Sequence, residues 1–202
     1  MGWIVVLYLQ QLSRSGESVT RVFLTLAIIS TILLAFVFFL GLNIGDAKIA
    51  EPEIQSAVSK HFLMAIGGLV LGMLVHALVL TYFMGTGRWL EETSKAYQLP
   101  DSYRAEGQGL KYRTLPLMVG AIFMLVMTGG FGGAADPASP VGFQGWFGIS
   151  PATLHLIVAS LALAINAAAN LQEFRALERN GEIIKQIVEE VRRIRNEHGL
   201  TD

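Results

Sequence analysis

Three of the four histidines, His61, His76 and His155, lie in stretches of the chain that contain no Asp, Glu, Lys or Arg. An imidazole in apolar surroundings needs a partner, because an unsatisfied buried polar group costs several kcal/mol. Ionisable residues inside membrane-crossing helices therefore mark candidate functional sites. The chemistry open to these histidines is cofactor ligation, proton relay or structural hydrogen bonding.

The first and third of these histidines begin two helical stripes of small and polar residues. At about 100° per residue, the stripe that starts at His61 continues with Gly68, Gly72 and His76. The stripe that starts at His155 continues at the same spacings with Ala162, Asn166 and Asn170. If both segments cross a membrane in the same direction, His61 and His155 lie at one level near the outer surface. His76 and Asn170 then share a second level, about 22 Å deeper.

Two imidazoles that face each other across small residues are suited to the axial ligation of a b-type haem. Gly68 and Gly72 would leave room for the macrocycle beside the helix backbone. In general arrangement the pattern resembles the membrane cytochromes b, in which histidines on core helices hold haem inside a four-helix bundle. The resemblance covers only the two histidine-bearing segments. It implies one haem b held by His61 and His155, because Asn170 would be a poor ligand for a second haem.

Other uses of these residues remain open from the sequence. Gly68 and Gly72 also form a pattern of small residues that lets membrane helices pack closely. His76 could hydrogen-bond Asn166 or Asn170, and all the polar residues of the stripes would then be structural, which is the commoner use of such residues. A proton-relay or transport role is the third alternative.

The composition is that of a membrane protein. The 202 residues are 52% hydrophobic and 15% charged, with a mean hydropathy of +0.50. Four charge-free windows can each hold the roughly 20 apolar residues that cross a bilayer as a helix. They predict an all-α, four-helix membrane bundle with spans at about 19–42, 61–84, 114–130 and 152–174.

Several function classes are excluded or disfavoured. The net charge of −1 offers no basic face for nucleic acid. The absence of cysteine excludes disulfides, thiolate catalysis and iron–sulfur ligation. Neither an HExxH motif nor a nucleophile elbow is present, so the sequence does not predict an enzyme beyond an electron-transfer subunit.

Basic residues predict the orientation. Residues 85–113 and 175–202 hold 11 of the 15 Lys and Arg residues, whereas residues 131–150 hold none. The positive-inside rule places both termini in the cytoplasm, and we expect a bacterial inner membrane. Residues 1–18 are predicted to form an interfacial segment with Trp3 and Tyr8 at headgroup level. Residues 129–151 are predicted to form a turn-rich outer loop with aromatic anchors.

Residues 175–202 are predicted to form a cytoplasmic amphipathic helix after a break at Asn180–Gly181. Its apolar side could dock on a partner subunit or on anionic lipid, or it could cover the end of its own bundle. The chain has no domain that could supply or use electrons, so a haem protein would work with other membrane subunits or as a homo-oligomer. The alternative function is a cofactor-free accessory or scaffold subunit that packs through its glycine stripe and docks through its C-terminal helix.

Overall fold

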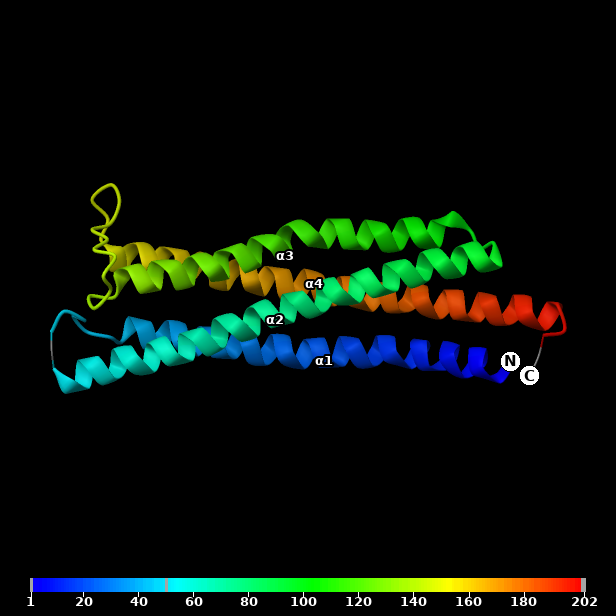
Figure 1. Cartoon of the computed structure of the whole chain (residues 1–202), viewed down its shortest axis with the longest axis horizontal. Helices are drawn as coiled ribbons and strands as arrows, with labels where there is room; N and C mark the ends of the chain where they lie inside the picture. Colours follow the sequence, from blue (N-terminus) through cyan, green and yellow to red (C-terminus); the bar gives the residue numbers. More distant parts are fainter. Residues whose placement is uncertain (1, 50, 201–202) are drawn as a thin grey trace. The chain divides into compact units, whose positions relative to one another are not determined.

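Four long α-helices make up the chain in the computed structural model, which describes residues 2–49 and 51–200 and the side chains from Ser18 onward in those ranges. Figure 1 labels the four helices and colours them along the sequence. They are α1 (Gly2–Leu42), α2 (Pro52–Tyr97), α3 (Asp101–Ala135) and α4 (Pro151–Glu197). All four are long and apolar enough to cross a membrane, and the described residues form no β-strand. The predicted all-α class with four candidate spans is therefore confirmed.

The helices extend well beyond the predicted spans. At 46 residues, α2 is about 70 Å long, whereas a bilayer core is about 30 Å thick. Hydropathy identifies the part of a helix that suits lipid, and it does not mark where the helix ends. Residues 2–18 belong to α1. The side chains of Trp3 and Tyr8 lie outside those that the structure describes, so their interfacial placement stays a prediction.

The connection between α2 and α3 is only three residues long, whereas the predicted spans on either side end at about residue 84 and begin at about residue 114. Gln98 adopts a left-handed conformation with φ of 53°, and the N–H of Leu99 donates to the carbonyl of Ser94 at 2.9 Å. This is the hydrogen-bond pattern of a Schellman helix end, and Pro100 follows it. The turn stops α2 within a few residues and lets α3 begin at Asp101.

Two further boundaries differ from the predictions. Residues 129–135 are the last turns of α3 and not part of a loop, so the connection between α3 and α4 covers residues 136–150. No break occurs at Asn180–Gly181, because α4 runs without interruption to Glu197. In both places the glycines that suggest a turn lie within regular helix. Two of them, Gly129 and Gly132, face side chains of α2 and α4 closely.

The helices contribute to two compact units. Unit 1 comprises Met1–Thr25, Ala77–Pro116 and Leu171–Asp202, and unit 2 comprises Leu26–His76 and Leu117–Asn170. Unit 2 contains only six charged residues, and all of them lie in the helix connections or in the first turns of α2. The apolar character that suits a membrane is thus strongest in unit 2, which also holds the three histidines of the stripes.

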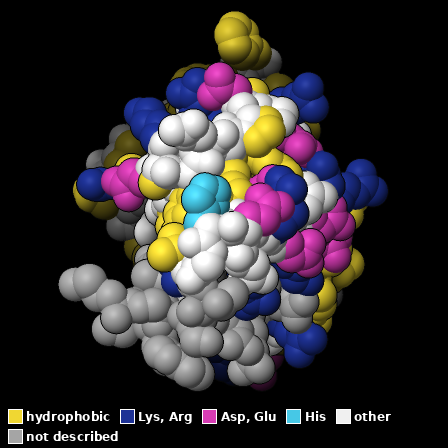
Figure 2. All heavy atoms as spheres, turned by 90° about the vertical axis from the view of Figure 1, so that its right-hand side faces the viewer, with side chains coloured by type: hydrophobic (Ala, Val, Ile, Leu, Met, Phe, Trp, Pro, Cys, Tyr) yellow, Lys and Arg dark blue, Asp and Glu magenta, His cyan; other side chains and the backbone are white. Residues whose placement is uncertain are grey.

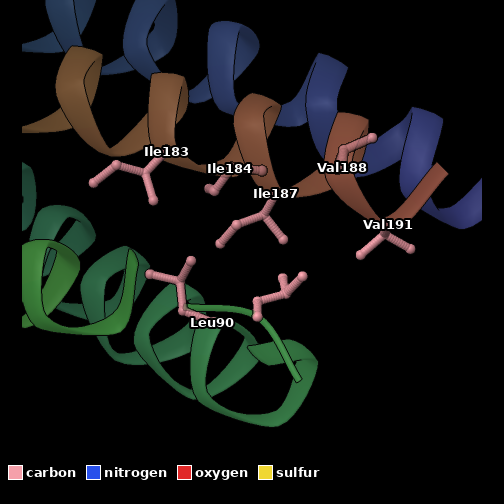
Figure 3. Packing of buried hydrophobic residues seen from close by; sticks show 7 residues of the cluster. Leu90, Ile183, Ile184, Ile187, Val188 and Val191 are labelled. Atoms are coloured by element: carbon pink, nitrogen blue, oxygen red, sulfur yellow. The ribbon is translucent and has the colours of Figure 1, made fainter. Parts of the chain in front are cut away.

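The apolar side of the C-terminal part of α4 forms the core of unit 1. Ile183, Ile187 and Val191 are fully buried, and they pack with Leu90 of α2 and with Leu99. Figure 3 shows Leu90 on one side of this cluster and the α4 residues on the other. The surface is polar by contrast, and Figure 2 shows Lys and Arg side chains mixed with Asp and Glu side chains on the end of this unit. The amphipathic side thus covers the chain's own helices, which is one of the two predicted arrangements.

A cross-helix ion pair also joins two helices of unit 1. Arg179 of α4 donates through Nε to Glu106 of α3 at 2.6 Å and through Nη1 to Glu182 at 2.7 Å. The hydrogen bond to Glu106, followed by the hydrogen bond to Glu182, raises the pKa of the Arg179 guanidinium above its ordinary value. Nearby, the amide of Asn180 donates to the hydroxyl of Thr86 at 3.2 Å. Asn180 therefore has a structural role inside a continuous helix.

Replacement of Ile187 by Ala tests the core of unit 1. The side chain is fully buried, so its loss should lower the free energy of unfolding by about 2–5 kcal/mol. Gln186→Ala is the matched control, because this neighbouring side chain is exposed on the same turn. Unfolding followed by circular dichroism in detergent measures both variants. Equal losses in the two variants would contradict the packing of this helix face.

Candidate functional site

His61 of α2 and His155 of α4 lie together in unit 2. Their ring centroids are 6.3 Å apart, and the ring planes are nearly perpendicular at 80°. Both side chains come from the first part of a long helix, and the sequence stripes predict that they share one level. The structure therefore brings together the two histidines that helical phase pairs.

The ring of His61 is oriented by the backbone of α1. Its Nδ1 lies 3.1 Å from the carbonyl oxygen of Val37. A carbonyl oxygen can only accept a hydrogen bond, so Nδ1 carries the proton and donates it. The neutral ring then has its free lone pair on Nε2. Nε2 is accordingly the atom of His61 that can accept a proton or bind a metal.

Glycines on the neighbouring helices lie against both rings in the same way. A Cβ on Gly41 of α1 would lie 2.9 Å from Cε1 of His61, and a Cβ on Gly132 of α3 would lie 3.0 Å from Cε1 of His155. Any side chain at either glycine would therefore press against an imidazole. The α1–α2 and α3–α4 hairpins thus present their histidines against equivalent glycines.

The equivalence extends in part to the carbonyls that face the rings. Val37 is four residues before Gly41, and Thr128 is four residues before Gly132. The Thr128 carbonyl lies close enough to interact with the His155 ring. The Nδ1 of His155 is buried without a hydrogen bond of normal geometry, so the second ring is held less firmly than the first.

The two glycines of the α2 stripe are covered by leucine side chains. A Cβ on Gly68 would lie 3.2 Å from Cδ2 of Leu34, and a Cβ on Gly72 would lie 3.0 Å from Cδ1 of Leu125. These contacts are the close helix packing that small residues permit. The expected role of both glycines beside a macrocycle stays a prediction.

His76 belongs to a separate polar cluster in unit 2. Its Nε2 lies 3.0 Å from Oδ1 of Asn166, and both side chains are buried. An amide oxygen only accepts, so His76 carries a proton on Nε2, the nitrogen that His61 leaves free. Asn170 donates to the hydroxyl of Thr31 on α1 at 3.1 Å, although helical phase pairs it with His76. The amide of Asn170, which the sequence pairs with His76 of α2, thus binds α1 instead.

Sequence reasoning misses several buried polar residues, among them Ser30 and Glu173. Ser30 of α1 is fully buried in unit 2 and faces Gly72, and no motif indicates it. Glu173 of α4 is fully buried in unit 1, although it lies just beyond a charge-free window and is easily assigned to the cytoplasmic flank. Helical phase is the signal that could have found Glu173, since it follows Asn166 and Asn170 at helical spacing.

Comparison with known proteins identifies no relative of this chain. No family model matches it, and no curated protein or solved structure is significantly similar to it.

Proposed function

We propose that the protein is an integral membrane electron-transfer subunit that binds one b-type haem, with His61 and His155 as the axial ligands. The observation that carries the proposal is the spacing of the two rings. An imidazole nitrogen lies about 2 Å from a metal that it binds, and the ring centre lies about 1 Å further away. Two rings on opposite sides of one metal thus have centres about 6 Å apart, and the observed separation is 6.3 Å.

The number of available ligands favours haem over a bare metal ion. The described residues contain no group of three or more His, Cys, Asp or Glu side chains that could hold a metal. A structural or catalytic zinc site needs at least three protein ligands. A haem needs only two axial ligands, because the macrocycle supplies the other four, and two imidazoles are what this site offers.

The surroundings of His61 support a ligating role. Its proton on Nδ1 is donated to the Val37 carbonyl, which orients the ring and leaves the lone pair on Nε2. Metal-binding histidines generally donate their other ring nitrogen in this manner. His76 is unsuited to the same task because its Nε2 donates to Asn166. The proposal therefore assigns ligation to two of the three histidines.

The donor set fits haem iron, and the macrocycle would require local rearrangement. Leu34 and Leu125 lie over Gly68 and Gly72, and their side chains would have to move to admit a macrocycle there. The nearest atom in each case is a terminal methyl carbon of a flexible leucine side chain. A bound haem would supply reversible one-electron chemistry. The chain would supply the two imidazoles, orient them and surround them with charge-free segments of its helices.

The absorption spectrum of the purified protein tests the ligand assignment. Protein expressed with ample haem should show Soret and α bands in a reduced-minus-oxidised spectrum. His61→Ala and His155→Ala should lose the α band, because each removes an axial ligand. His76→Ala is the control and should keep the band. A colourless wild-type protein, or a band that only His76→Ala removes, would refute the proposal and leave the histidines as structural contacts.

The glycines behind the rings provide a finer test. Gly132→Ala should weaken haem binding by about tenfold or more, since its Cβ would displace the His155 ring. Gly133→Ala is the matched control, because a Cβ there meets nothing within 4 Å and the gain in helix propensity is the same. Haem titration followed by absorbance measures both affinities. Equal affinities in the two variants would show that Gly132 does not position a ligand.

Cysteine labelling tests the proposed topology, in which both termini are cytoplasmic in a bacterial inner membrane. The chain has no cysteine, so single-cysteine variants need no background changes. A membrane-impermeant maleimide should label Ser139→Cys in intact spheroplasts, since this residue lies in the α3–α4 connection. It should label Asn196→Cys only after lysis. The reverse pattern would invert the orientation.

A further inference from the structure

The connection between α3 and α4 ends in a tight and unusual turn. The N–H of Trp146 donates to the carbonyl of Ile149 at 3.2 Å, and the N–H of Ile149 donates to the carbonyl of Trp146 at 2.8 Å. Phe147 and Gly148 between them have φ values of 53° and 78°. Positive φ at both central positions defines a type I′ turn, which normally takes Asn-Gly or Gly-Gly. Phe147 therefore occupies a position that a bulky aromatic side chain disfavours.

Two hydrogen bonds between Trp146 and Ile149 close the turn, but no packing of the Phe147 side chain compensates for its conformation. The side chain of Phe147 is 100% exposed, so it makes no packing contact that would stabilise the turn. A bulky residue with positive φ is a genuine outlier, and such strain tends to mark functional positions. A packing contact for Phe147 would therefore come from outside the part of the chain that the structure describes.

The turn is held rigidly on α3 by three aromatic rings. Trp146 packs edge-on against Phe131 and Phe143. Its ring centroid lies 5.4 Å from that of Phe131 and 5.6 Å from that of Phe143, with interplanar angles of 89° and 88°. Gly145 has a φ of 93°, and a Cβ there would overlap the carbonyl oxygen of Ile149. The backbone that presents Phe147 is therefore fixed by packing on one side and by a required glycine on the other.

The chemistry of the connection identifies the bilayer as the external partner. Residues 136–150 carry one charged side chain, Asp136, whose carboxylate accepts the N–H of Ala138 within its own turn. Val141 and Trp146 are exposed beside Phe147, so the surface is apolar. Complementary charge often guides the approach of a protein partner, and Asp136 is the one charge that this connection offers. The connection joins the ends of α3 and α4 (Figure 1), which are apolar enough to cross a membrane. Aromatic side chains at the ends of membrane-crossing helices partition into the membrane–water interface.

We propose that the Trp146–Ile149 turn is a membrane-inserting wedge that places Phe147 among the lipid chains at the bilayer surface and Trp146 at headgroup level. The proposal requires that α3 and α4 cross the membrane, and it is independent of haem. The wedge would fix the depth of the end of α3 that contacts His155.

Tryptophan fluorescence tests the wedge in the full-length protein. Trp3→Phe and Trp89→Phe together leave Trp146 as the single tryptophan. In liposomes of phosphatidylcholine, Trp146 should be quenched strongly by lipids brominated near the headgroup end of the acyl chain and weakly by aqueous iodide. Strong iodide quenching with no effect of brominated lipid would overturn the proposal.

Phe147→Asn is the decisive variant because it separates lipid contact from folding. Asn followed by Gly148 is the favoured sequence for this turn, so thermal stability in detergent should be equal or higher. Quenching by brominated lipid should nevertheless fall, and the Trp146 emission should move to longer wavelength. Gln144→Ser, at an exposed polar position of the same connection, should change neither. Unchanged lipid quenching in Phe147→Asn, or a loss of thermal stability, would contradict a bilayer role for this side chain.

Discussion

The full or partial removal of imidazole rings from water, among charge-free helix segments, is the constraint on which the rest of unit 2 depends. Each ring nitrogen that leaves water needs a compensating partner. His61 uses a backbone carbonyl of α1, and His76 uses the side-chain amide of Asn166. The difference matters for the proposed function, because a ring that donates through Nδ1 keeps its lone pair on Nε2. The amide instead engages the corresponding nitrogen of His76.

The two hairpins repeat one another at the His61–His155 level and diverge further along the helices. Gly41 faces His61 as Gly132 faces His155, with nearly the same distances. Eleven residues beyond each histidine the helices differ, since Gly72 of α2 corresponds to an asparagine in α4. His76 likewise has an asparagine as its counterpart. A repeated hairpin that keeps two facing histidines at one level only is consistent with a single metal site and with a hydrogen-bonded inner cluster that stabilises the bundle.

The sequence predicts the apolar helices and the pairing of His61 with His155, because both follow from local periodicity and charge. It does not predict the helix ends. The continuation of α4 depends on Ile187 and its neighbours packing against Leu90, which is a tertiary contact. The sequence also does not show whether Gly68 and Gly72 make room for a haem or for a neighbouring helix. A small residue allows either one to approach the helix backbone. Glu173 is missed because the charge-free window of sequence ends just before it. The helix face that carries Asn166 and Asn170 nevertheless continues to Glu173.

The central claim is that His61 and His155 ligate one haem iron from opposite sides. Electron paramagnetic resonance of the oxidised, haem-loaded protein tests it most directly, since the signal reports both the ligands and the angle between their planes. Ring planes near 80° predict a strongly anisotropic low-spin ferric signal that is lost in His155→Ala. A high-spin ferric signal, or a low-spin signal unchanged in His155→Ala, would contradict the account.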